Sequence, residues 1–109
     1  MNVKGIEVKG IDVDENTRCK HYHKEIDIIA LKFKCCDTYY PCHLCHAEVA
    51  DHPPVLWGKD ERGTKAILCG ACGTELTIQE YMDSDSTCTS CHSSFNEGCK
   101  RHYHLYFEM

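Results

Sequence analysis

Cysteine and histidine residues dominate this chain and fall in short, closely spaced groups. Ten cysteines and eight histidines occur among 109 residues. The groups are Cys19-x-His21, Cys35-Cys36, Cys42-x2-Cys45-His46, Cys69-x2-Cys72, Cys88-x2-Cys91 and Cys99-x2-His102-x-His104. A gap of two residues lets two sulfur atoms reach one ion from a tight turn, and four such ligands complete the tetrahedral shell that Zn²⁺ prefers. The sequence therefore predicts a protein folded around several zinc ions.

Disulfide bonds are the alternative use for so many cysteines in a small chain. Residues 1–14 alternate charged and apolar side chains and lack the apolar stretch of a secretory signal. We therefore expect a reducing compartment, where clustered cysteines bind metal more often than they oxidise. Histidine has no role in a disulfide but is a good zinc ligand. These observations favour metal over disulfides and predict a cytoplasmic location.

The charge of the chain limits its partners. Asp and Glu number 17 against 12 Lys and Arg, which gives a formal net charge of −5. Domains that bind nucleic acid present a basic surface instead. Even the apolar run 26–33 contains Asp27 and Lys32, and it is too short to span a bilayer. We expect neither nucleic acid nor a membrane as partner.

The last four paired cysteines form a recognisable pattern. Cys69-x2-Cys72 and Cys88-x2-Cys91 are separated by fifteen residues. This spacing is typical of a zinc ribbon, in which four thiolates hold one ion. Glycines beside the first pair allow the tight turn that aims backbone N–H groups at sulfur. We predict that these four cysteines share one zinc ion.

Eight further candidate ligands precede the ribbon, enough for two more tetrahedral sites and three zinc ions in total. They are Cys19, His21, Cys35, Cys36, Cys42, Cys45, His46 and His52. Adjacent residues of an extended chain point to opposite sides, so we expect Cys35 and Cys36 to bind different ions, and likewise Cys45 and His46. One consistent division gives one ion Cys42, Cys45, His52 and one of the adjacent cysteines, and the other ion Cys19, His21, His46 and the second adjacent cysteine.

Three metal-binding side chains remain near the C-terminus. Cys99, His102 and His104 have a spacing that suits a fourth ion if His92 joins them. The alternative is a free Cys99 thiol, with the two histidines packed in a last strand. We expect three other histidines to face solvent or to support ligands, namely His23, His43 and His92.

Two zinc-enzyme signatures can be rejected. Residues 41–48 contain P-C-x2-C and H-x-E, the pieces of a zinc deaminase signature, but in reverse order and abutting. The H-E-x-x-H sequence of zinc proteases is absent. Catalytic zinc keeps one position for water, whereas twelve ligands for three ions leave no obligatory open position. We therefore expect a protein that is not an enzyme.

The predicted fold is a small zinc-stabilised domain of mostly short β-strands, with zinc knuckles and one short helix near residues 44–51. Residues 3–8 are nearly repeated by residues 8–13, which indicates a hairpin at a sheet edge. We place an N-terminal extended segment at 1–16 and the zinc domain at 17–109. Residues 60–63 are expected to form a loop or turn. Further strands are expected at 26–33, 65–69, 75–78 and 102–108, the last closing the sheet.

The sequence Cys19-Lys-His21-Tyr22 resembles the motif that gives CHY-type zinc fingers their name. The likeness covers residues from about 17 to 107 and continues through Cys35-Cys36, Tyr40, Cys42-x2-Cys45-His46, His52, Cys69-x2-Cys72, Cys88-x2-Cys91 and Phe95. The resemblance implies three zinc ions held by the twelve residues named above. It is strongest to short stand-alone members of bacteria and fungi, because the second cysteine/histidine module and the RING domain of the ubiquitin-ligase members are absent.

Three classes of function follow. The first is a structural zinc-binding module whose three ions build a surface for a protein partner of unknown identity. The second is a zinc- or thiol-handling factor that exchanges zinc or assists the oxidative folding of a partner. A fungal family member that helps small import chaperones in the mitochondrial intermembrane space is an example of this second class. The third is a catalytic or nucleic-acid-binding role, which the acidic charge and the complete ligand sets disfavour.

Overall fold

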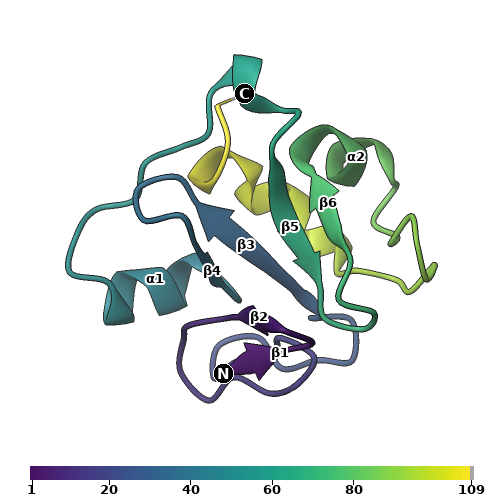
Figure 1. Cartoon of the computed structure of the whole chain (residues 1–109), viewed down its shortest axis with the longest axis horizontal. Helices are drawn as coiled ribbons and strands as arrows, with labels where there is room; N and C mark the ends of the chain where they lie inside the picture. Colours follow the sequence, from purple (N-terminus) through teal and green to yellow (C-terminus); the bar gives the residue numbers. More distant parts are fainter. Residues whose placement is uncertain (109) are drawn as a thin grey trace.

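A four-stranded antiparallel sheet lies at the centre of the molecule (Figure 1). The computed structural model describes residues 1–108, apart from the side chains of residues 98–101. The strands follow the order β4-β3-β5-β6 across the sheet. Their bounds are Ile29–Phe33 for β3, Thr38–Tyr40 for β4, Lys65–Cys69 for β5 and Glu75–Thr77 for β6. Three of these strands match predicted ones, whereas β4 was not predicted.

An N-terminal hairpin forms, but within the first copy of the predicted repeat; the second copy, residues 8–13, contributes only the isolated bridge of Val8 to Tyr39 in β4. Strands β1 (Asn2–Val3) and β2 (Ile6–Glu7) pair through a two-residue turn. Lys4 and Gly5 both have positive φ, at 49° and 92°, as a type I′ hairpin turn requires. The chain then reaches β4, where the Lys9 N–H donates to the Tyr39 carbonyl over 2.9 Å.

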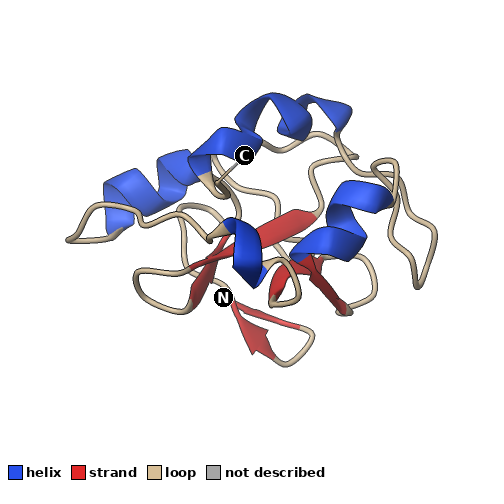
Figure 2. Cartoon of the chain, turned by 90° about the horizontal axis from the view of Figure 1, so that it is seen from above, coloured by secondary structure: helices blue, strands red, loops and turns tan. Residues whose placement is uncertain are grey.

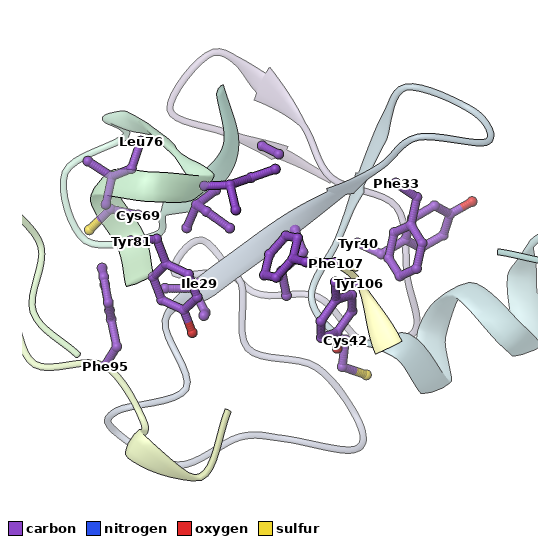
Figure 3. Close-up of a cluster of buried hydrophobic side chains, with 14 of the residues drawn as sticks. Ile29, Phe33, Tyr40, Cys42, Cys69, Leu76, Tyr81, Phe95, Tyr106 and Phe107 are labelled. Carbon is purple, nitrogen blue, oxygen red and sulfur yellow. The ribbon is translucent and has the colours of Figure 1, made fainter. Parts of the chain in front are cut away.

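The two faces of the sheet bury different side chains. Ile29, Leu31 and Phe33 alternate along β3 and belong to the larger apolar cluster (Figure 3). Ala30 points the other way and packs in a smaller cluster with Val3. The C-terminal helical segment therefore covers one face and the N-terminal hairpin covers the other (Figure 2).

The structure contains the predicted helix and a second one. Helix α1 (His43–Val49) agrees with the helix expected near 44–51, and the sulfur of Cys42 caps it by accepting from the Cys45 N–H. Helix α2 (Ile78–Asp83) was not predicted. Its start is a capping box, because the Thr77 hydroxyl accepts from Glu80 N and the Glu80 carboxylate accepts from Thr77 N. The predicted fold class, a small zinc-stabilised domain of short strands, is confirmed.

The prediction of a closing strand at residues 102–108 is wrong. Residues Glu97–Leu105 form a 3-10 helix, η2, and another short one, η1, spans Lys59–Glu61 in the expected loop region. The N–H groups of Tyr106 and Phe107 both donate hydrogen bonds to the Tyr103 carbonyl, over 3.0 and 2.8 Å. Both side chains are buried although they are neighbours, so the alternation of a half-exposed strand does not apply.

Trp57 connects the C-terminal segment to the sheet. Trp57 forms a parallel bridge with Phe107. Its ring N–H donates to the Lys32 carbonyl over 2.7 Å, which ties the same residue to β3. Within residues 1–108, every helix is too short or too polar to cross a bilayer.

A comparison of two glycines tests how tightly the ribbon turn is packed. A Cβ at Gly70 would overlap the backbone carbonyl of Asn16, whereas a Cβ at Gly63 would meet nothing within 4 Å. Gly70→Ala should lower the free energy of unfolding of the zinc-loaded protein by about 2 kcal/mol or more, because neither backbone segment can yield cheaply. Gly63→Ala is the matched control and should stay within about 1 kcal/mol. Urea denaturation measures both, and equal stability of the two variants would contradict the packing described.

Candidate metal centres

The structure gathers the twelve residues singled out from the sequence into three groups of four. The ligand atoms within each group all lie within 4.8 Å of one another. The first group comprises Cys19, His21, Cys42 and Cys45; the second comprises Cys35, Cys36, His46 and His52; the third comprises Cys69, Cys72, Cys88 and Cys91. Each group offers four N or S atoms, the number that a tetrahedral zinc site uses.

The distances within the first group match a zinc shell. A tetrahedron with Zn–S bonds of about 2.3 Å and Zn–N bonds of about 2.0 Å separates two sulfurs by roughly 3.8 Å, and sulfur from nitrogen by roughly 3.5 Å. Cys19 Sγ and Cys42 Sγ are 3.7 Å apart. His21 Nδ1 lies 3.5 Å from Cys42 Sγ and 3.4 Å from Cys45 Sγ. Cys19, Cys42 and Cys45 are buried, so the site is part of the core.

The second group shows the same spacing and holds an otherwise unsatisfied atom. Cys35 Sγ is 3.9 Å from Cys36 Sγ and 3.3 Å from His46 Nε2. The His46 ring stacks on Phe33 at 4.1 Å, and burial lowers its pKa, which favours the neutral form that a metal ligand requires. His52 Nε2 is buried and has no hydrogen-bond partner. A metal ion at this position would satisfy that atom.

The third group is a ribbon site with one buried and one exposed half. Cys69 and Cys88 are buried, whereas Cys72 and Cys91 are exposed. The sulfur separations are 3.8 Å for Cys69–Cys91 and 3.7 Å for Cys72–Cys88. The N–H groups of Ser90 and Cys91 donate to Cys88 Sγ at 3.4 and 3.5 Å, as in a zinc knuckle.

The two halves of the ribbon site also differ in thiol acidity. Burial raises the pKa of Cys69 and Cys88. Burial also raises the pKa of Cys72, but hydrogen bonds with Thr74 outweigh it and lower the pKa to about 6. A hydrogen bond with the Ser93 hydroxyl, 3.2 Å away, lowers the pKa of Cys91. The exposed thiols are therefore the ones that reach the metal-binding thiolate form most readily.

Disulfides do not account for these groups. Sulfur atoms in a disulfide are about 2.05 Å apart. The sulfur pairs described above are 3.7–3.9 Å apart in every group. All nine cysteines whose side chains the structure describes are free. The expectation of metal instead of disulfides therefore agrees with the geometry.

The predicted division of the first eight ligands between two ions is wrong. It placed His52 with Cys42 and Cys45, whereas His52 lies with His46. It placed His46 with Cys19 and His21, whereas Cys42 and Cys45 join those two residues.

Cys35 and Cys36 belong to the same group, not to different ones. The chain is not extended there: it turns between β3 and β4, with the Asp37 N–H donating to Phe33 O over 2.8 Å and Asp37 at φ 52°. The turn brings both sulfurs to one side, so the alternation of an extended chain does not apply.

The adjacent pair in α1 does divide between two groups, as predicted. Cys45 belongs to the first group and His46 to the second. In a helix, neighbouring side chains are about 100° apart, which also sends them to different sides. Because Cys42 joins Cys19 and His52 joins the cysteines of the β3–β4 turn, the two groups lie on either side of one helix.

Two acidic residues that the sequence reasoning missed support the histidine ligands. The Glu48 carboxylate lies 3.3 Å from His21 Nε2, the nitrogen that faces away from the thiols. The Asp51 carboxylate lies 3.0 Å from His52 Nδ1 in the same way. A carboxylate on the far nitrogen fixes the tautomer and orientation of a metal-binding histidine. The adjacency of Asp51 and His52 is a sequence signal that could have indicated the second pair.

The other histidines lie outside the three groups. His23 and His92 are exposed, and His43 lies beside the hydroxyl of Tyr106 at 3.3 Å. His102 packs against Tyr22 and His43, and His104 is exposed. The Cys99 side chain lies outside the described part of the chain, so both alternatives, a free Cys99 thiol and a fourth ion, stay untested.

The donor chemistry fits zinc in each group. Tetrahedral sets of thiolate and imidazole ligands select Zn²⁺ over the oxygen-preferring divalent cations. The first group offers three thiolates and one imidazole, the second offers two of each, and the third offers four thiolates. The fold and the sites thus define a small zinc-binding domain with three metal centres.

Comparison with known proteins places this domain in a family. Residues 19–106 match the CHY zinc finger, and the chain belongs to the CHY zinc finger family. It is 46% identical over 104 residues to the Helper of Tim protein 13 of Saccharomyces cerevisiae, covering 93% of this chain and 90% of the relative. The protein of the same name in Kluyveromyces lactis is 41% identical over 101 residues, 93% of this chain and 88% of the relative. A BRUTUS-like zinc finger protein of Arabidopsis thaliana is 32% identical over 79 residues, 72% of this chain and 5% of the relative.

Substitution of one ligand should remove one ion. Cys69→Ser should lower the zinc count from three to two and destabilise the fold severely, because a hydroxyl is a far poorer zinc donor than a thiolate. The control His23→Ala changes an exposed residue outside the groups and should keep all three ions. Native mass spectrometry gives the counts. If His23→Ala also loses an ion, the ligand set of the first group is wrong.

Loss of the supporting carboxylate should weaken the second site without removing a ligand. Asp51→Asn should reduce zinc affinity there by about 10–100-fold, because His52 loses the acceptor that orients its ring. Asp12→Asn is a matched control, since Asp12 is exposed and asparagine tolerates its φ of 55°. Competition with a chelator of known affinity measures the change. Equal affinities in the two variants would show that Asp51 does not support the site.

Proposed function

We propose that this chain is a structural zinc module that presents an interaction surface to a protein partner, and that it is not an enzyme. The observation that carries the proposal is the completeness of all three ligand groups. A catalytic zinc has three protein ligands and one position for water or substrate. Here each group offers four protein ligands, which suits zinc that holds a fold together.

Several features support a protein as the partner. Two relatives that match almost the whole chain are named as helpers of Tim, and we infer that this chain likewise assists another protein. Leu44 and Val49 on α1 and Val55 just beyond it are 40%, 44% and 48% exposed, so this segment presents apolar side chains to solvent. The net charge of −5 argues against nucleic acid, and we propose no membrane partner either.

The ribbon site favours one alternative, a factor that handles zinc or thiols. Cys72 and Cys91 are exposed, and the pKa of each thiol is lowered. Exposed thiolates are accessible to another thiol protein for metal or disulfide exchange. Under this alternative the domain exchanges zinc with a partner or assists its oxidative folding. A cytoplasmic location remains part of the first proposal, since free cysteines suit a reducing compartment.

One experiment tests the proposal against the alternative. The chain is loaded with isotopically labelled zinc, incubated with an extract of its source cells, cross-linked and measured by native mass spectrometry. A structural module should appear in a complex with a specific protein and should still carry three labelled ions. Loss of label in that complex would favour the zinc-handling alternative.

The control for this experiment removes the exposed apolar side chains. Leu44→Ser with Val49→Ser leaves every ligand group intact, because neither residue belongs to one. The variant should keep three labelled ions and lose the complex. If the variant and the natural chain capture the same proteins to the same extent, α1 does not provide the interaction surface.

A further inference from the structure

A cavity of about 210 Å³ lies beside the first metal centre. Ile29 and Leu31 of β3 line it, together with Pro41 and Cys42 in front of α1. Figure 3 shows Cys42 next to Tyr106, which lines the same cavity. The volume is below the roughly 300–1,000 Å³ of clefts that hold drug-sized ligands, and it suits a single long side chain.

Aromatic rings form one wall of this cavity. Tyr22, His102 and Tyr106 all line it. The centroids of the Tyr22 and His102 rings are 6.3 Å apart, in an edge-to-face arrangement. The centroid of the His43 ring is 5.0 Å from that of His102 and 6.2 Å from that of Tyr106. The rings therefore support one another and hold a fixed wall. Tyrosine rings attract cations at their electron-rich faces, so Tyr22 and Tyr106 make this wall suited to a cation.

A buried carboxylate lies in the same cavity. Asp27 is only 7% exposed. Its Oδ1 accepts from the Asn96 side-chain amide at 2.8 Å and its Oδ2 accepts from the Lys24 N–H at 3.0 Å. These bonds orient the group, and a carboxylate can accept about four hydrogen bonds. No ion pair to Asp27 is found among the described side chains.

The first metal centre adds to the negative potential of the cavity. Three thiolates and one neutral imidazole around a divalent ion leave a net charge of −1, and Cys42 belongs to both the site and the cavity wall. The whole chain carries −5 as well. A cation is therefore the ligand that this cavity favours, because a charge in a low-dielectric pocket interacts strongly with its neighbours.

We propose that this cavity binds the basic side chain, arginine or lysine, of the protein partner. The apolar stem of that side chain lies along Ile29 and Leu31, and its cationic end lies between the tyrosine rings and Asp27. Basic side chains bury their methylene groups and keep the charged end at a polar partner in this way. The inference rests on the proposed function, because it assigns the pocket to the partner of that surface.

The first test needs no variant. The full zinc-loaded chain, labelled with ¹⁵N, is titrated with the N-acetyl methylamides of arginine, lysine and citrulline, and amide chemical shifts are followed. Citrulline has nearly the shape of arginine but no charge. The basic probes should cause saturable shifts at residues 27–31 and 102–106, with dissociation constants at least about tenfold lower than citrulline. The tighter of the two basic probes identifies the residue type that the partner supplies.

A variant pair localises the effect. Asp27→Asn removes the buried charge and should weaken arginine or lysine binding by about tenfold or more while leaving citrulline unchanged. Asp60→Asn removes an exposed charge on η1 and should leave all three probes unchanged. The zinc count of each variant shows that it is folded.

Three outcomes would overturn the inference. They are equal affinities for citrulline and the basic probes, equal losses in the two variants, or shifts that appear only at exposed acidic residues. If one of these outcomes is found while the chain still forms a stable partner complex with three labelled ions, the cavity inference fails and the proposed function stands. Absence of any such complex, with probe binding preserved, would reject the proposed function and with it the assignment of the pocket to a partner, while the preference of the cavity for cations would stand.

Discussion

Tetrahedral zinc coordination is the constraint on which the rest of the structure depends. Each ion requires four ligand atoms within about 4 Å, and here those atoms come from segments far apart in the chain, such as residues 19–21 with 42–45 and 69–72 with 88–91. Structural zinc contributes roughly 10–16 kcal/mol per site in small peptides. A domain has a total stability of only about 5–15 kcal/mol. Short strands and two short helices therefore suffice here, because metal coordination supplies what a larger core would otherwise provide.

The sequence predicted which residues gather into metal-binding groups better than it predicted how they divide between the ions. Ligand spacing indicated three zinc sites, apolar patterning located β3, β5 and β6, and helix-forming residues located α1, because these signals are local. The division of ligands between the first two ions was wrong. It separated Cys35 from Cys36 because it assumed an extended chain where β3 turns into β4, and it also separated His46 from His52. Residues 102–108 alternate in sequence, but Tyr106 and Phe107 are both buried, in the turn and bridge that follow η2. The start of α2 was visible in Thr77 and Glu80, and it was missed because the preceding strand pattern runs into Ile78.

The contacts of the loops and the cavity could not be predicted from the spacing of cysteine and histidine in the sequence. Glu48 reaches His21 across 27 positions, and Asn96 reaches Asp27 across 69. Such contacts exist only once the metal centres and the sheet have fixed where the loops lie. The same holds for the cavity, whose walls come from β3, the segment before α1 and the C-terminal helical segment. The first zinc site and the cavity therefore share a residue. Cys42 is a ligand of the first metal centre, and it also lines the cavity.

The position of α1 between two metal centres has a consequence for how the protein matures. Cys45 and His46 are neighbours in one seven-residue helix, yet they serve different centres. Too short to be stable alone, this helix has a defined orientation only when both of its sides are held. The first two centres should therefore fill as a cooperative pair, in which the arrival of one ion preorganises the site for the next. The ribbon shares no ligand-bearing element with them, so its ion does not hold either side of α1.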